Sequence, residues 1–170
     1  MQRTEVLLLV EEMQNSLDAH DDIEHLYATY LPAFMDAQTR YARDAVMLAE
    51  ILTNTYTCVE TILFRIARVF ENHLDAQQWR KALLHKMRVE VPGVRKAVLS
   101  PEAYTALDEL RRFRHFRRYY YNFDYDWGRL DYLRAVYERG LPVLRRDLAL
   151  YTGVLLDLAN GNENLSSKTL

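Results

Sequence analysis

The sequence predicts an all-α protein, because residues that interrupt helices are rare and apolar residues recur at helical spacing. Only five glycines and four prolines occur in 170 residues. Apolar side chains follow the i, i+3, i+4 repeat of a helix face over nearly the whole chain, and no segment predicts a strand. A chain of this length fills one core, so we expect a single domain over residues 1–160 and a frayed polar tail at residues 161–170.

Three helical stretches are expected in the first half of the chain. Apolar residues line one face from residue 3 to about residue 18, and the polar residues 20–22 are expected to end this helix. A second stretch then meets Pro32, which kinks or divides a helix because proline lacks a backbone donor. Residues 33–71 contain no proline or glycine, which predicts one long helix, or a broken pair, at the centre of the fold.

Capping signals mark the helices of the second half. Asp75 is expected to cap a helix over about residues 79–87, since its carboxylate can accept from first-turn amides. Ser100 gives the clearest helix start, because a proline and then an acid follow it. Asp126 is expected to cap the last helix.

Composition excludes several classes of protein. The single cysteine, Cys58, lies in an apolar helical run, which excludes a disulfide framework and favours a reducing, cytoplasmic setting. No apolar window approaches the roughly 18 residues that span a bilayer, so we expect no membrane association. Neither a persuasive metal-ligand spacing nor a glycine-rich phosphate loop is present, and we therefore predict no metal and no cofactor.

Residues 111–121 form the most informative segment, which we call the basic run. They hold five arginines, one histidine and three tyrosines, and no carboxylate lies between Leu110 and Phe123. The formal net charge of the whole chain is only -2. Concentrated positive charge on a nearly neutral protein predicts a polyanionic ligand, with nucleic acid as the first candidate.

The basic run continues the apolar face of its own helix. Core-facing positions such as Leu107 and Leu110 extrapolate by helical spacing to Arg114, Arg117 and Tyr121. An unpaired guanidinium is very costly to bury, so this face must meet acidic partners, a wet dimer cleft or a ligand anion. In the structural interpretation, Arg114 and Arg117 pair with carboxylates of another helix, for which the candidates are Asp124, Asp126 and Asp131.

His115 is the candidate acid or base of the basic run. It lies four residues after Arg111 and three before Arg118, and so shares a helix face with two cations. Neighbouring positive charge favours the neutral imidazole, which is the form that accepts a proton.

Residues 110–121, followed by the segment 124–127, resemble the HEPN superfamily, and within it the HepT-like toxins encoded beside minimal nucleotidyltransferase antitoxins. Upstream, residues 54–67 look like the long central helix of that group and residues 79–99 like its connecting segment. The resemblance covers about residues 45–158. It implies a HEPN-like helical bundle with one long central helix.

The motif of that family is an arginine, a polar residue directly after it, a histidine five positions after the arginine, and a tyrosine two positions beyond. Arg114, His115 and Tyr121 match three of these positions, and Tyr119 stands where the histidine is usual. The resemblance implies a metal-independent endoribonuclease with Arg114, His115 and Tyr119 as catalytic residues. Because the usual histidine takes part in RNA cleavage, two interpretations stay open: His115 takes over the proton transfer, or cleavage has been lost.

The resemblance also implies partners. Two protomers would form a homodimer with a cleft between them, in which Arg111, Arg117 and Arg118 bind RNA. A minimal nucleotidyltransferase antitoxin would attach AMP to the motif tyrosine, here Tyr121. The added phosphate would place negative charge among the arginines and so exclude an RNA phosphate.

Two alternatives to the ribonuclease toxin remain at this point. One is a noncatalytic HEPN module that binds a nucleotide or a partner protein and is associated with a nucleotidyltransferase. The other is a purely structural role for the basic run, as an internal network of ion pairs.

Overall fold

The computed structural model describes residues 2–70, 79–120 and 123–161. Within these ranges the chain forms five helices and no strand, so the all-α prediction is confirmed. The helices are α1 (Arg3–Met35), α2 (Ala42–Phe70), α3 (Trp79–Arg88), α4 (Pro101–Arg117) and α5 (Trp127–Ala159). The cap predicted at Asp75 lies outside the described residues.

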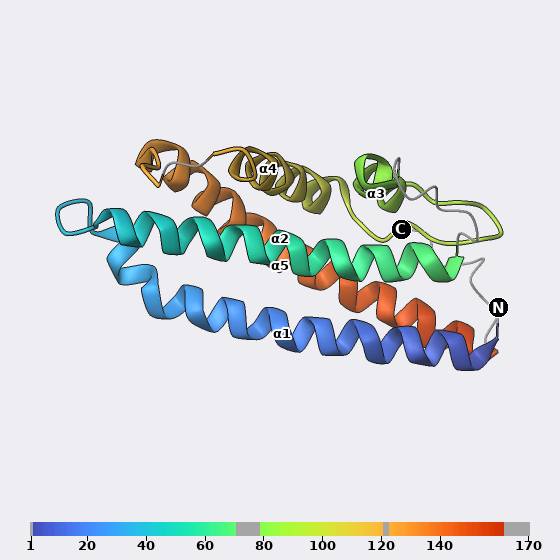
Figure 1. Ribbon diagram of the computed structural model, residues 1–170. Helices are drawn as coiled ribbons and strands as arrows, with labels where there is room; N and C mark the ends of the chain where they lie inside the picture. The colour runs from blue at the N-terminus through green and yellow to red at the C-terminus, as the bar shows by residue number, and fades with distance from the viewer. Residues whose placement is uncertain (1, 71–78, 121–122, 162–170) are drawn as a thin grey trace.

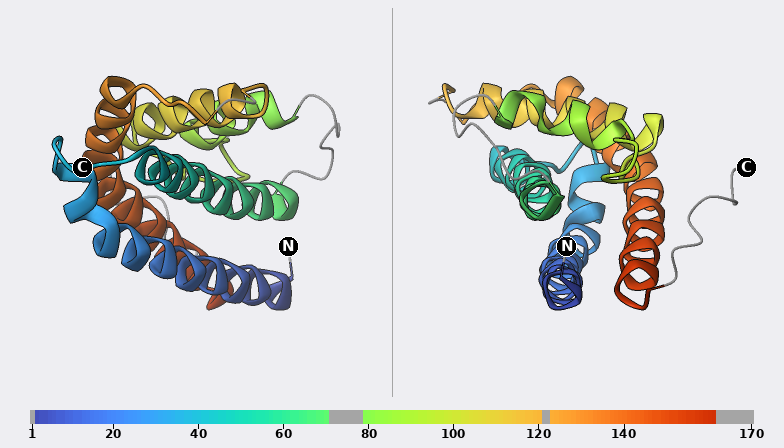
Figure 2. Two further views of the ribbon diagram at one scale, coloured as in Figure 1. Left: turned by 60° about the vertical axis from the view of Figure 1, so that its left-hand side comes forward. Right: turned by 90° about the vertical axis from the view of Figure 1, so that its right-hand side faces the viewer.

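The helices form a bundle in which α2 is central. Figure 1 shows α1, α2 and α5 extending along the molecule, with the shorter α3 and α4 beside each other. In the end-on view of Figure 2, α3 and α4 lie opposite α1, and α2 and α5 occupy the two sides between them. α4 packs against both α2 and α5. The basic run, which begins in the last turns of α4, therefore lies close to α2.

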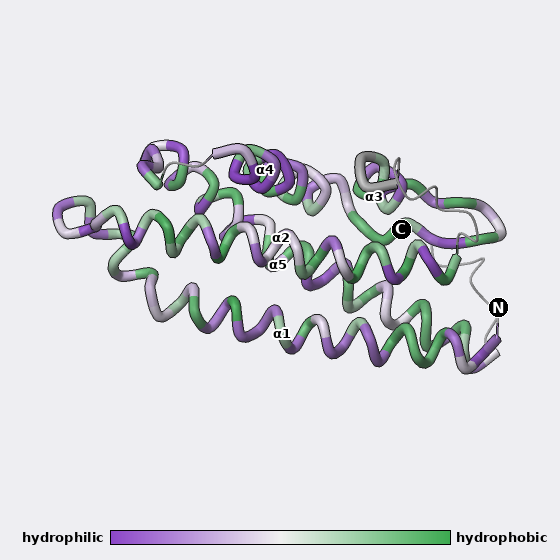
Figure 3. Tube along the Cα trace, viewed as in Figure 1, coloured by the Kyte–Doolittle hydropathy of each residue, from purple (hydrophilic) through white to green (hydrophobic). Residues whose placement is uncertain are grey.

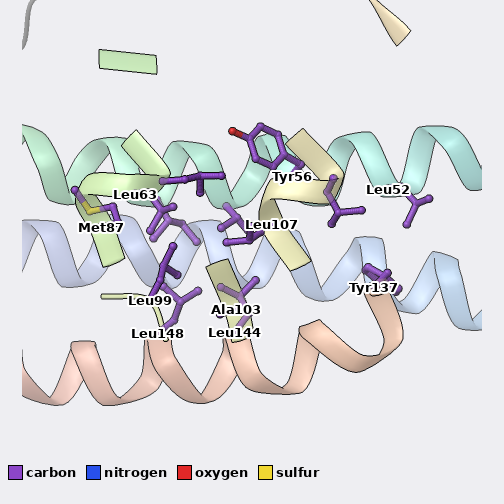
Figure 4. Close-up of a cluster of buried hydrophobic side chains, with 14 of the residues drawn as sticks. Leu52, Tyr56, Leu63, Met87, Leu99, Ala103, Leu107, Tyr137, Leu144 and Leu148 are labelled. Atoms are coloured by element: carbon purple, nitrogen blue, oxygen red, sulfur yellow. The ribbon is translucent and has the colours of Figure 1, made fainter. Parts of the chain in front are cut away.

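The core is built from helix faces that the apolar spacing predicts. Leu52, Tyr56 and Leu63 recur at i, i+4 and i+11 on α2, and each is at most 1% exposed. They belong to one buried cluster with Leu107 of α4 and Leu148 of α5. In Figure 4, Tyr56 lies at the edge of this cluster with its hydroxyl oxygen directed away from the leucines.

The predicted helix boundaries in the first half are wrong in two places. α1 continues through residues 20–22 to Met35, and Pro32 lies in its last turn, where it neither divides nor ends the helix. The break falls instead at residues 36–41, near the start of the segment for which one long helix, or a broken pair, was predicted. Asp36 accepts hydrogen bonds there from the backbone of Gln38 at 3.0 Å and from the hydroxyl of Thr39. These side-chain contacts compete with the helical pattern and close a turn.

The predicted helix starts in the second half are confirmed. The Ser100 hydroxyl accepts from the Ala103 amide at 3.3 Å, and the Asp126 carboxylate accepts from the Arg129 amide at 2.8 Å. The backbone amide of Ser100 also donates to Asp147 of α5 at 2.7 Å. The start of α4 is therefore held both by its own cap and by Asp147 of α5.

A buried polar group explains why α1 continues past residue 20. His20 is 2% exposed, and its Nδ1 lies 2.9 Å from Glu24 one turn later. Glu24 also accepts from Arg145 of α5, which pairs with Asp21 as well. Burial, together with the nearby Arg145 charge, lowers the pKa of His20 although the Glu24 carboxylate acts to raise it.

The lowered pKa of His20 predicts a loss of stability in acid. The folded state binds the His20 proton more weakly than the unfolded state does. The free energy of unfolding should therefore fall as the pH drops below the ordinary histidine value of 6.5. Urea unfolding at pH 7.5 and pH 5.5 measures the difference, and His20→Gln should reduce it. His25→Gln, at an exposed histidine of α1, should leave the difference unchanged; an equal effect of both substitutions would contradict the assignment.

Candidate RNA-binding site

The end of α4 turns its apolar side to the core and its arginines to α2 and to solvent. Phe113 is 1% exposed, whereas the next residue, Arg114, is only partly buried. Figure 3 shows that hydrophilic residues are prominent along α4. The helix ends at Arg117, so Arg118 and Tyr119 follow its last turn.

Arg114 lies between α4 and α2. Its Nη1 is 3.3 Å from Glu60 Oε2, and its guanidinium carbon is 5.6 Å from the centre of the Tyr56 ring. The Tyr56 hydroxyl donates to the other oxygen of Glu60 at 3.3 Å, and burial raises the pKa of Tyr56 above its ordinary value. Glu60 therefore orients Arg114 through a single contact, and most of the five guanidinium donors are left for a ligand.

Arg117 is bound more extensively. Its donors reach the Glu50 carboxylate at 2.8 Å, the Thr53 hydroxyl at 2.9 Å and the Ala49 carbonyl at 3.1 Å, all on α2. Its Nε donates to the Tyr125 hydroxyl at 3.1 Å. This guanidinium joins α4 to α2 and to the segment before α5.

The pairing with another helix that the sequence left open therefore exists, but the partners lie on α2. Arg114 pairs with Glu60 and Arg117 with Glu50, whereas Asp131, one of the candidates, pairs with Arg40 at 2.9 Å. A signal for this surface was present in the sequence. Polar residues recur on α2 at i, i+3, i+7 and i+10, and they line one helix face: Glu50, Thr53, Thr57 and Glu60.

The other three arginines of the basic run, Arg111, Arg112 and Arg118, lie at the surface of α4 or just after it. Arg111 and Arg112 both lie 2.7 Å from the Asp108 carboxylate of their own helix, so an upstream acid neutralises part of the charge. Arg118 is exposed, and its side chain makes no hydrogen bond or ion pair within the described part of the chain. It is the cation of the run best placed for an external anion.

The candidate acid and base are both accessible to solvent. His115 is exposed, and Tyr119, one turn later, is 64% exposed. The two rings meet edge to face with their centres 5.2 Å apart. Tyr121, the predicted acceptor of AMP, lies outside the described residues.

The structure brings together groups that can bind a phosphate and move a proton. Arg114 and Arg118 offer guanidinium donors, and His115 and Tyr119 offer an imidazole and a phenol on the adjoining exposed face. Among the described residues, no group of three or more His, Cys, Asp or Glu is arranged to hold a metal ion. No helix in the same ranges combines the length and apolar character of a membrane span.

A comparison with known families finds a match over most of the chain. A family model described as HepT-like protein matches residues 47–155, which run from the second turn of α2 almost to the end of α5 and include the whole described basic run. No curated protein and no solved structure matches the chain significantly.

Proposed function

The chain belongs to the HepT-like protein family of the HEPN superfamily, and from this premise we propose that it is a ribonuclease toxin of a toxin–antitoxin system. The observation that carries the proposal is the arrangement at the end of α4. Arg114 keeps free donors beside an exposed imidazole, and its contact with α2 is a single ion pair. A purely structural arginine would be bound as Arg117 is.

In the proposed reaction, a ribose 2′-hydroxyl of the RNA attacks the adjacent phosphodiester and cleaves the strand. Arg114 holds the scissile phosphate through two parallel N–H···O contacts, and Arg118 holds an adjacent phosphate. The neutral imidazole of His115 accepts the proton of the ribose 2′-hydroxyl, whose oxygen attacks the adjacent phosphorus. The bond from phosphorus to the 5′-oxygen breaks, and the Tyr119 hydroxyl protonates that oxygen as it leaves. These steps need an acid and a base but no metal.

The proposed site is completed by a second copy of the chain and controlled by a second protein. Two protomers pack their α4 helices together, so that Arg111 and Arg118 from both copies line an RNA-binding cleft and Arg117 supports its wall. A minimal nucleotidyltransferase neutralises the toxin by attaching AMP to Tyr121. The new phosphate is a local anion that occupies the guanidinium donors in place of RNA.

Expression of the chain alone tests the proposal. Wild-type protein should arrest growth and degrade cellular RNA, and Arg114→Ala should slow cleavage by about 10²-fold or more, because one donor that stabilises developing charge is lost. His115→Ala should lose cleavage and keep most of its RNA binding. Growth, RNA integrity and cleavage of a labelled oligonucleotide by purified dimer are the readouts.

The matched control is Arg139→Ala, which removes an exposed arginine of α5. It should arrest growth as the wild type does. Intact RNA after wild-type expression and no cleavage by the purified protein would contradict the toxin. Together with retained nucleotide or partner binding, that result would favour the noncatalytic module, for which Tyr119 in the histidine position is the supporting observation.

A further inference from the structure

A further exposed arginine lies against α4, toward the end of the helix that is opposite the basic run. The guanidinium carbon of Arg88, the last residue of α3, is 4.6 Å from the centre of the Tyr104 ring. Arg88 is exposed, and among the residues that the structure describes its side chain makes no hydrogen bond or ion pair. Glu90, the nearest acid in the sequence, is paired with Lys96 at 2.8 Å. Stacking therefore holds the guanidinium while its N–H donors stay available to an anion.

Tyr104 lies on the same side of α4 as part of the basic run. Successive side chains of a helix are about 100° apart. By this spacing, three residues of the run lie within roughly 40° of Tyr104 around the helix axis, namely Arg111, His115 and Arg118. All three are at least partly exposed. Together with Tyr104 and Arg88 they form a strip about 21 Å long, which we call the α4 stripe.

The acidic residues of α4 do not interrupt the α4 stripe. Glu102 and Glu109 lie roughly 120° or more around the helix from each of its α4 residues. Asp108 lies within the stripe, but Arg111 and Arg112 both approach its carboxylate to 2.7 Å. Two cations on one carboxylate leave a net positive charge at this point. The stripe therefore offers positive charge at both ends and in its middle.

The distribution of charge over the whole bundle favours the same side. The sequence of α3 contains four Lys or Arg and no Asp or Glu, whereas that of α1 contains seven Asp or Glu and one Arg. In the end-on view of Figure 2, α3 and α4 lie opposite α1. A field oriented in this way repels a polyanion from α1 and attracts it to the side of the molecule that carries the α4 stripe.

We propose that the α4 stripe binds the RNA strand beyond the cleavage site, with Arg88 as the far phosphate contact. This inference rests on the proposed binding of RNA by the basic run. From Arg114 and His115 the strand follows α4 toward its N-terminal end, and Tyr104 lies about 16 Å from His115 along the helix. Arg88 then holds a phosphate several nucleotides from the scissile one. Contacts to phosphates fix the register of a strand and do not read its bases.

Binding of an RNA that cannot be cleaved tests the α4 stripe separately from the reaction. The probe is a labelled 2′-O-methyl dodecauridine, in which the attacking hydroxyls are methylated. Fluorescence anisotropy gives its affinity between about 50 and 200 mM salt. Arg88→Gln should weaken binding by about 2- to 5-fold, as expected for one exposed ion pair. It should also make the slope of log K against log salt shallower by about 0.7, the value for one contact with a single strand.

Arg3→Gln is the matched control, because it removes an exposed arginine of α1, on the opposite side of the bundle. It should change neither the affinity nor the salt dependence. Oligocytidine should show the same loss with Arg88→Gln as oligouridine, because the contact is made to the backbone.

Substitutions of Tyr104 test how Arg88 is held. Tyr104→Phe keeps the ring and should bind the probe as the wild type does. Tyr104→Leu removes the stacking surface, so it should weaken binding and should add little to the loss caused by Arg88→Gln. Tyr104 is half-buried and Arg88 is exposed, so Arg88→Gln decides the question even if Tyr104→Leu fails to fold.

Equal effects of Arg88→Gln and Arg3→Gln, or a salt dependence that Arg88→Gln leaves unchanged, would overturn the α4 stripe and leave the toxin standing, since cleavage is measured independently. Absence of binding to the probe would also overturn the stripe. Loss of cleavage in the wild type, with binding that still depends on Arg88, would overturn the toxin instead and leave the stripe as the RNA-binding surface of a noncatalytic module.

Discussion

Gly140→Ala is expected to lower the free energy of unfolding by about 2 kcal/mol, within the range for overpacked cores. A β-carbon at Gly140 of α5 would lie 2.3 Å from the β-carbon of Ala106 on α4. Neither methyl group has a rotamer to change, so the two helices would have to separate. The gain in helix propensity, about 1 kcal/mol for alanine over glycine, is too small to offset that separation. Urea unfolding measures the difference.

Two further variants isolate the contact between α4 and α5. Gly153→Ala makes the same change in the same helix at an exposed position with no atom within 4 Å, so it should stabilise the protein by up to about 1 kcal/mol. Adding Ala106→Gly to Gly140→Ala leaves the Ala106 α-carbon at 3.8 Å as the nearest atom, and should restore part of the loss. Equal stability of the two alanine variants would contradict the close approach.

Local signals explain which parts of the fold could be predicted. Ser100 and Asp126 cap their helices by accepting from amides three residues away. Both partners of each hydrogen bond therefore lie within a few residues of sequence, where a local pattern can reveal them. The end of α1 was misplaced because the polar residues near position 20 are compensated from far away. The partner of Glu24 is Arg145, 121 positions along the chain. No local pattern shows that a polar group is paired inside a bundle.

The arginines of α4 could be identified from the sequence, but their contacts could not. The spacing of α4 predicted that Arg114 and Arg117 continue the buried face, whereas that face continues through Phe113 and the two arginines turn to α2, partly buried. It could not show which helix faces them, because that depends on how α2 is rotated against α4. Glu50 and Glu60 became identifiable as partners only once the packing of the two helices was known.

The two arginines of this face differ in a way that stability measurements can detect. Arg114 makes one ion pair, at 3.3 Å, and its side chain is 30% exposed. Arg117 is 19% exposed and is bound by three residues of α2 and by Tyr125. Hydrogen bonds to a charged group that is held in place this way contribute more than a partly solvated ion pair. Arg117 therefore belongs to the framework that positions Arg114.

Arg117→Ala is accordingly expected to lower the free energy of unfolding by about 2 kcal/mol, whereas Arg114→Ala should lower it by no more than about 1 kcal/mol. Arg117→Lys should recover only part of the loss, because an ammonium cannot reproduce the fork that reaches Glu50, Thr53 and Tyr125 together. Urea unfolding of the three variants gives the comparison. A larger loss of unfolding free energy for Arg114→Ala than for Arg117→Ala would contradict this assignment. Arg114, at the motif position, would then be the arginine that holds the structure together. Growth arrest relieved by Arg114→Ala could then no longer be separated from unfolding.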